Sequence, residues 1–160
     1  MRHKLFITIG CPGSGKSTWI RNNETLFGDN SFIVSRDSIR FSFLGTEDGY
    51  FKHEKEVYKY LINTVKTALS DCESVIIDAT HINKASRQKL FKHLGEHLEN
   101  VQVNALVFER DIETLLANNS NRTGREFVPE DVIQRFFNSY EKPTFDEGFD
   151  NILYVEYNRI

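Results

Sequence analysis

The segment between residues 10 and 18, Gly-Cys-Pro-Gly-Ser-Gly-Lys-Ser-Thr, constrains this chain more than any other feature. It matches the pattern G-x-x-x-x-G-K-[ST], follows the short apolar stretch Leu5–Ile9, and precedes a helical pattern that begins near Lys16. Glycines let such a loop wrap closely around a phosphate with its N–H groups pointing inward, and the helix N-terminus adds partial positive charge. A random match in a chain of this length occurs roughly once in two hundred. The pattern therefore predicts a nucleotide-binding P-loop.

This motif also predicts individual roles. Lys16 is expected to reach the β- and γ-phosphates of ATP and to act in catalysis, and the Ser17 hydroxyl is expected to ligate Mg²⁺. Mg²⁺ is the expected metal because hydroxyl and phosphate oxygens are hard ligands. The predicted nucleotide-binding residues of the loop are Gly10, Pro12, Gly13, Ser14, Gly15, Lys16, Ser17 and Thr18.

Short apolar stretches alternate with helical patterns along the rest of the chain. The predicted strands are 5–9, 32–34, 74–77, 101–108 and 152–155; the predicted helices are one from about 16, then 37–43, 52–69, 84–98, 112–119 and 130–140. This alternation predicts an α/β fold with a five-stranded parallel sheet flanked by helices. Ligands of such sheets bind at the carboxyl ends of the strands, so the polar segments there should converge on one site.

Length and composition limit the class of protein. The 160 residues correspond to a single domain over 1–160, with no linker or repeat. The formal net charge of −3 argues against a broad nonspecific nucleic-acid binder but leaves room for a small basic site, for which a shallow salt dependence is expected. Two cysteines and the lack of a long apolar run predict a soluble, cytoplasmic protein without membrane contact.

The third predicted strand ends in Asp78, which has the form of a Walker B carboxylate. Such an aspartate holds Mg²⁺, usually through water, or braces an arginine; the alternative is a simple strand-end cap. The next residue is Ala79, where motor-type ATPases generally have a water-activating glutamate, so that class is disfavoured. The guanine-specific Asn-Lys-x-Asp motif is also missing from the sequence.

A second carboxylate follows the second strand. Asp37 is placed to accept a proton from a hydroxyl that attacks the γ-phosphate, and Arg40, three residues later, shares its helix face. The pair would offer a base and a cation to an anionic acceptor. The alternative interpretation makes Asp37 a helix N-cap with a local surface ion pair to Arg40.

The polar segment around 118–128 contains Arg122 and Arg125. In a kinase such a segment is a lid that closes over ATP and supplies arginines to the transferring phosphoryl group. The alternative is a solvated loop with ordinary surface arginines.

Together these segments resemble the kinase module of the polynucleotide 5′-kinase family, which includes bacteriophage polynucleotide kinases and the kinase half of polynucleotide kinase-phosphatases. The residues that carry the resemblance are Gly10 to Thr18, Ser35-Arg36-Asp37 with Arg40, Asp78-Ala79-Thr80 with Ser86-Arg87, Asn121-Arg122, Val128-Pro129, Tyr140 to Thr144, and Glu147 to Phe149. They span nearly the whole chain.

The resemblance implies a P-loop NTPase core similar to adenylate kinase with a small lid, and ATP-dependent phosphorylation of a 5′-hydroxyl of DNA or RNA, as in end repair. It makes Asp37 the general base and Arg122 the lid arginine, both catalytic beside Lys16. It assigns Arg125 to the nucleotide with Arg122. The implied acceptor-binding residues are Arg36, Asp37, Arg40, Asp78 and Thr80.

The resemblance has limits. Relatives from phages often carry a further arginine one turn before the lid arginine, where this chain has Asn118. A phosphatase motif of the DxDGT type is missing, so no phosphatase domain is predicted. If the chain is phage-encoded, the cytoplasm is that of the host.

Two other classes of function remain open. A P-loop kinase with another acceptor, such as a modified base, a nucleoside or a small metabolite, would keep Lys16, Ser17 and Asp37. A non-catalytic nucleotide-binding module would not need Asp37 and Arg122 to face the P-loop across one cleft. His81 is a further candidate for the acceptor cleft, as is the segment 45–55, whereas His93 and His97 are expected at the surface.

Overall fold

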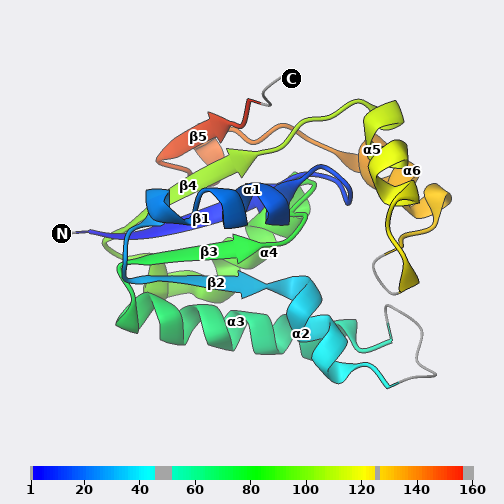
Figure 1. The fold of residues 1–160 in the computed structure, drawn as a ribbon. Coiled ribbons are helices and arrows are strands. Elements are labelled where there is room, and N and C mark those ends of the chain that lie inside the picture. The colour runs from blue at the N-terminus through cyan, green and yellow to red at the C-terminus, as the bar shows by residue number, and fades with distance from the viewer. Residues whose placement is uncertain (1, 46–51, 125–126, 157–160) are drawn as a thin grey trace.

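Five parallel strands form the centre of the computed structural model, which describes residues 2–45, 52–124 and 127–156 (Figure 1). The strand order is β2-β3-β1-β4-β5, and each neighbouring pair is parallel. The predicted α/β class with a five-stranded parallel sheet is therefore confirmed. The strands are β1 (His3–Ile9), β2 (Ser31–Ser35), β3 (Ser74–Asp78), β4 (Val101–Val107) and β5 (Asn151–Tyr154).

Helices connect the strands and cover the sheet. The α-helices are α1 (Lys16–Asn22), α2 (Arg36–Phe43), α3 (Glu54–Asp71), α4 (Lys84–Leu94), α5 (Ile112–Ser120) and α6 (Glu130–Ser139), and short 3-10 turns are η1 (Glu24–Phe27), η2 (Gly95–Leu98) and η4 (Phe145–Glu147). The predicted helix 84–98 divides at Gly95, whose positive φ of 49° ends α4. Within the described ranges, no helix is long and apolar enough to span a membrane.

Apolar side chains on both faces of the sheet explain why these strands are buried. One cluster packs Leu5 and Ile7 of β1 against Val65 of α3 and Leu90 of α4. A second cluster, on the other face, joins Ile20 of α1 to strand and loop residues that include Ile76 and Phe108. Figure 1 shows α1 on one side of the sheet and α3 and α4 on the other. Parallel strands need both faces covered, which their continuous apolar sequences provide.

The strand order places the site. The chain leaves β1 toward β2 and β3 on one side and later adds β4 and β5 on the other, so the carboxyl end of β1 lies where the order reverses. Ligands of open parallel sheets bind at this point. The P-loop follows β1, and Asp78 ends the adjacent strand β3.

Candidate active site

The P-loop owes its shape to its glycines. Gly13 and Gly15 have φ values of 84° and 89°, a region that residues with side chains rarely adopt. A Cβ added to Gly13 would also lie 2.9 Å from the carbonyl oxygen of Leu115 in α5. The glycine at position 13 is therefore required both by backbone conformation and by the close approach of α5 to the loop.

Lys16 is buried at the start of α1, and its ammonium lies within the loop. Its Nζ donates hydrogen bonds to the carbonyl oxygens of Gly10 at 2.9 Å and Cys11 at 2.8 Å. Burial lowers the pKa of Lys16 to about 8, and the nearby carboxylate of Asp78 opposes part of this shift. The ammonium is thus held among loop oxygens, inside the loop whose N–H groups would bind a phosphate.

Ser17 and Asp78 form the polar pair beside Lys16. The Ser17 hydroxyl donates to Asp78 Oδ2 at 2.6 Å, and Asp78 is 8% exposed. Burial raises the pKa of Asp78, while the hydrogen bond from Ser17 and the charge of Lys16 oppose the rise. A hydroxyl and a carboxylate in contact are the hard oxygen donors that suit Mg²⁺. The pair fits the metal of a P-loop site. The hydrogen bond places Asp78 beside the P-loop, and its role in binding the acceptor stays a prediction.

On the opposite wall, α2 presents Asp37 and Arg40. Ser35 caps the helix, its side chain accepting from Ser38 N–H at 3.2 Å, so the alternative interpretation of Asp37 as the N-cap is wrong. Asp37 forms an ion pair with Arg40. The aspartate side chain is 56% exposed and the arginine only 8% exposed, so the carboxylate is accessible from the cleft while the guanidinium lies behind it.

Glu54, the first residue of α3, holds two arginines of this wall. Its carboxylate accepts from Arg40 Nε and, at 3.1 Å, from Arg40 Nη2, and at 3.0 Å from Arg36 Nη2. Burial would raise the pKa of Glu54, but the hydrogen bonds and charges of Arg40 and Arg36 outweigh it and hold this pKa below its usual value. Two carboxylates and two guanidiniums therefore balance one another at this wall.

The segment after α5 closes the site from a third side. Asn118, which replaces the arginine of some relatives, donates from Nδ2 to the Gly13 carbonyl at 2.8 Å. The buried Asn119 side chain donates to Val128 O at 2.6 Å and accepts from Val128 N–H at 3.0 Å. These bonds join the two ends of the predicted lid. The first residues of that lid, 118–120, belong to the last turn of α5, and Arg125 lies outside the described residues.

These three walls enclose a cleft of about 280 Å³. Asp37 and Arg122 both line it, together with the P-loop, so the two residues face the loop across one cleft. Its other lining residues include Arg36, Arg40, Glu54, Asp78, Ala79, Thr80, Val128 and Phe136. An adjoining hollow of about 440 Å³ lies between α1 and α5, lined by residues such as Trp19, Asn22, Arg110 and Asn118, and it shares Gly13, Gly15, Thr18 and Arg122 with the cleft.

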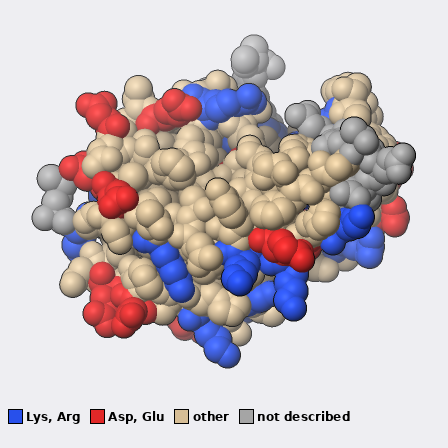
Figure 2. Space-filling view, turned by 90° about the horizontal axis from the view of Figure 1, so that it is seen from below, with Lys and Arg blue, Asp and Glu red and all other residues tan. Residues whose placement is uncertain are grey.

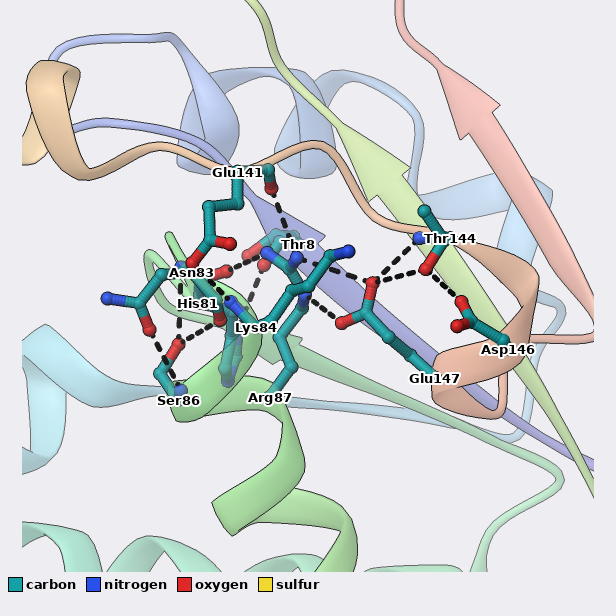
Figure 3. Close-up of polar contacts among 10 residues, drawn as sticks. All are labelled: Thr8, His81, Asn83, Lys84, Ser86, Arg87, Glu141, Thr144, Asp146 and Glu147. Carbon is teal, nitrogen blue, oxygen red and sulfur yellow. Dashed lines mark hydrogen bonds and ion pairs between the residues drawn. The ribbon is translucent and has the colours of Figure 1, made fainter.

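Beneath the cleft, a buried arginine fixes the segment that follows Asp78 (Figure 3). Arg87 of α4 is 0% exposed; it donates to the carboxylate of Glu147 at 2.7 Å and to the carbonyl oxygens of His81 at 2.9 Å and Glu141 at 3.0 Å. His81 Nδ1 bonds to the Thr8 carbonyl at 2.8 Å. Burial lowers the pKa of His81 to about 4, so the ring is neutral. His81 is thus a structural residue and not part of the cleft lining.

The same segment is attached to β1 by two further contacts. The Thr8 hydroxyl donates to Ala79 O at 2.7 Å and accepts from Ala79 N–H at 3.0 Å. Gly10 N–H donates to Thr80 O at 3.0 Å. Ala79 and Thr80 therefore form a fixed wall of the cleft, supported from β1 on one side and from Arg87 and the C-terminal segment on the other.

Sequence reasoning missed several residues of this site. The segment 45–55 was predicted to help shape the cleft, and its residue Glu54 does line it, but Glu54 itself was not singled out; residues 46–51 of that segment lie outside the described residues. Phe136 appeared only as one member of the apolar stripe of α6, yet it lines the cleft. Arg110 gave no motif at all. His93 and His97 are exposed, as predicted. Among the described residues, no group of three or more His, Cys, Asp or Glu side chains is placed to hold a metal.

A P-loop beside a Walker B carboxylate, faced across a cleft by an aspartate on a separate helix, defines the P-loop kinase class. Comparison with known proteins agrees. The profile of an AAA-domain family, AAA_33, matches residues 5–143, so the chain belongs to this family of P-loop domains.

Solved structures similar to the chain include two from the Pnkp1/Rnl/Hen1 complex, the first described as an RNA repair complex. In the first, a chain is 29% identical with a TM-score of 0.72, covering 86% of this chain and 44% of that one. In the second, the identity is 30% and the TM-score 0.59, with 72% and 38% covered. The present chain thus spans less than half the length of these relatives. The predicted similarity to polynucleotide 5′-kinases is confirmed.

A more distant structure, a gluconokinase from Sinorhizobium meliloti, is 18% identical with a TM-score of 0.60, covering 95% of this chain and 81% of that one. At this identity the likeness concerns the fold alone. The chain is a P-loop kinase domain, and its acceptor has to be argued from its own cleft.

Proposed function

We propose that this protein transfers the γ-phosphoryl group of ATP to the 5′-hydroxyl of a DNA or RNA strand. The observation that carries the proposal is the cleft in which Asp37, flanked by Arg36 and Arg40, lies across from the P-loop. An accessible carboxylate suits a hydroxyl acceptor, and adjacent guanidiniums suit an acceptor that carries a phosphate. The similarity to chains of the Pnkp1/Rnl/Hen1 complex supports the same choice.

The reaction follows from these positions. The acceptor hydroxyl gives its proton to the Asp37 carboxylate as its oxygen bonds to the γ-phosphorus, and the bond from that phosphorus to the bridging oxygen breaks to release ADP. Lys16 and Arg122 stabilise the charge on the transferring group. Ser17 and Asp78 would hold Mg²⁺, which neutralises phosphate charge and orients the phosphates when bound.

The cleft divides between donor and acceptor. The phosphates would lie along the P-loop N–H groups, with the nucleoside of ATP in the adjoining hollow between α1 and α5. The acceptor would enter beside α2 and the fixed wall of Ala79 and Thr80. Val128 and Phe136 offer an apolar surface that suits an aromatic base.

A second candidate is a P-loop kinase for another hydroxyl, such as one on a modified base, a nucleoside or a small metabolite. One observation favours it: the guanidiniums of Arg36 and Arg40 are already paired with Glu54, and Arg40 also with Asp37. A nearly neutral wall is compatible with an uncharged acceptor. An anionic acceptor would have to compete with Glu54 for the guanidinium of Arg40.

A phosphoryl-transfer assay with γ-labelled ATP separates these candidates. The panel contains 5′-OH DNA, 5′-OH RNA, DNA with a hydroxylated base, nucleosides and simple sugars, with the Lys16→Ala variant as the background control. We expect label on the 5′-end of an oligonucleotide, removable by a phosphatase and absent from an oligonucleotide that already carries a 5′-phosphate. Transfer to nucleosides or sugars but not to oligonucleotides would overturn the proposal in favour of the second candidate.

A further inference from the structure

Lysines gather on the face that α3 and α4 form on the side of the sheet opposite α1. Helix α4 contains no acidic residue and contributes the exposed Lys89 and Lys92, and α3 contributes the exposed Lys55 and Lys59 and the half-buried Lys66. Figure 2, which looks at the molecule from below, shows basic groups across the middle and lower part of this face, with acidic groups beside them. We call these five lysines the basic track. The chain as a whole carries a net charge of −3, so its charge is unevenly distributed.

These lysines differ from three buried or half-buried arginines of the molecule, which are held by carboxylates. Arg36 and Arg40 are held by Glu54, and Arg87 is held by Glu147. By contrast, no lysine of the basic track forms a salt bridge with an acidic side chain in the described part of the chain. The cations that do form salt bridges there are Arg2, Arg36, Arg40, Arg87, Arg135 and Lys142. Acidic residues of α3 lie near the track, but its lysines are in none of these salt bridges, and cations without an acidic partner favour a polyanion.

An aromatic residue connects this face to the cleft. The guanidinium of Arg36, which lines the cleft, lies 5.7 Å from the ring centroid of Tyr58. The ammonium of Lys89 lies 4.4 Å from the same ring, and the Tyr58 hydroxyl bonds to His93 Nδ1 at 2.8 Å. Tyr58 thus joins Arg36 at the start of α2 to Lys89 of α4. The basic track begins at the cleft and runs away from it along both helices.

We propose that the basic track binds the sugar-phosphate backbone of the acceptor strand beyond its terminal nucleotide. The inference rests on the proposed function, because it gives that strand a path out of the cleft. From Lys55 to Lys66 the track extends eleven residues along α3, about 16 Å at the helical rise per residue, which is enough for more than one phosphate. Phosphate contacts add affinity without sequence preference, as an end-processing kinase requires.

This proposal changes the salt dependence expected from the net charge alone. A terminal nucleotide gripped inside the cleft gives a shallow dependence. Each phosphate bound by the basic track adds about −0.7 to the slope of log affinity against log salt for a single strand. The slope should therefore steepen as the acceptor lengthens and then level off when the track is filled.

The test compares acceptors of increasing length: a nucleoside 3′-phosphate and single-stranded 5′-OH oligonucleotides of 2, 6 and 12 nucleotides. The variant K59Q/K89Q/K92Q removes three cations of the basic track, and the control variant K4Q/R135Q removes two exposed cations elsewhere. We expect the KM of the wild type to fall about tenfold or more from the shortest to the longest acceptor. The triple variant should lose this gain and about 2 units of salt slope with the 12-mer, while its kcat/KM for the nucleoside 3′-phosphate and its Tm stay unchanged.

The outcomes separate the two proposals. If the wild type phosphorylates the 12-mer no better than the nucleoside 3′-phosphate, or if K4Q/R135Q loses as much as the triple variant, the basic track is wrong and the proposed function stands. If no nucleic acid is phosphorylated, the proposed function is wrong. Fluorescence anisotropy with a labelled 12-mer then decides the track directly: salt-sensitive binding that the triple variant loses supports it, and equal binding by both proteins overturns it.

Discussion

The two halves of the cleft are built by different means. On the donor side, the P-loop is shaped by its backbone: positive φ values at Gly13 and Gly15, N–H groups at a helix start, and a lysine held by loop carbonyls. On the acceptor side, α2 and α3 meet through side chains alone, with Asp37, Arg36, Arg40 and Glu54 paired in one group. A backbone cradle can bind only phosphate, whereas a side-chain wall can be changed residue by residue. The difference explains how one donor site serves kinases with many acceptors.

The largest expected effect lies on the acceptor side. Asp37→Asn keeps the shape of the side chain but removes the base, so kcat should fall by about 10²–10⁴-fold. The affinity for ATP, measured by calorimetry, should stay within a factor of two or so of the wild type because Asp37 belongs to α2 and not to the P-loop, and its charge makes one of the smaller contributions to the pKa of Lys16. Lys16→Ala is the comparison on the donor side, and it should lose both turnover and ATP affinity. Near wild-type transfer by Asp37→Asn would exclude Asp37 as the base.

A second effect concerns the wall between the two halves. Arg87→Met leaves the Glu147 carboxylate buried without its cation, and breaking such a pair typically costs about 3–5 kcal/mol. Urea unfolding should show a loss of this size. The double variant Arg87→Met/Glu147→Leu should recover much of it, because both buried charges are then gone.

The double variant also tests, in the phosphoryl-transfer assay, whether Arg87 supports catalysis as well as stability. Without Arg87, the carbonyls of His81 and Glu141 lose their donor, and the segment of Ala79 and Thr80 loses its support from below. We expect kcat to stay reduced even where stability is recovered. Full recovery of both would mean that Arg87 serves stability only.

The donor half was predictable from the sequence and the acceptor half was predictable only in part. The P-loop is a local pattern in which nine consecutive residues encode conformation and ligand together, and the apolar strands around it encode the parallel sheet. Asp37 and Arg40 were predictable as neighbours on one helix. Glu54, by contrast, contacts Arg40 from the start of α3, and Phe136 lines the same cleft from α6. No local sequence pattern encodes such long-range contacts.

Two details show where local patterns mislead. Aspartate is a common N-cap residue, yet Ser35 and not Asp37 caps α2. The helix begins directly after β2, so Asp37 lies in its first turn. His81 lies three residues after Asp78, the carboxylate at the end of β3, yet its ring turns inward to the Thr8 carbonyl, and its backbone has a φ of 43°. In both cases the packing of the strand ends, and not the neighbouring sequence, decides where the side chain lies.

A third effect tests how the acceptor wall is assembled. Glu54→Gln keeps the shape but removes the charge that holds Arg36 and Arg40, so kcat/KM for the acceptor should fall about tenfold while ATP affinity is unchanged. Glu56→Gln, an exposed neighbour on the same helix, is the control and should behave like the wild type. An increased affinity of Glu54→Gln for a phosphorylated acceptor would instead mean that Glu54 competes with the substrate.

The same residue contributes to stability in a defined pH range. The pKa of Glu54 in the folded chain lies below its usual value of 4.5, so its ion pairs stabilise the fold above that pH. The contribution is lost as pH falls through the lowered pKa of the folded state. Acid unfolding of Glu54→Gln should therefore show a weaker pH dependence in this range than the wild type, and an identical dependence would contradict the pairing.

The smallest effect lies on the donor side and concerns Lys16. Burial lowers the pKa of this lysine to about 8, so the free enzyme loses the proton as pH rises through that value, whereas bound phosphate favours the ammonium. At high pH, Lys16 must therefore take up a proton when ATP binds. The Kd for ATP should increase by at most about tenfold between pH 7 and pH 9. Lys16→Arg keeps its charge over this range and should show a flat profile, though with weaker binding. A Kd that does not change with pH in the wild type would mean that the loop oxygens around Nζ keep Lys16 protonated up to pH 9. The hydrogen bonds of the loop would then outweigh the effect of burial on the pKa of Lys16.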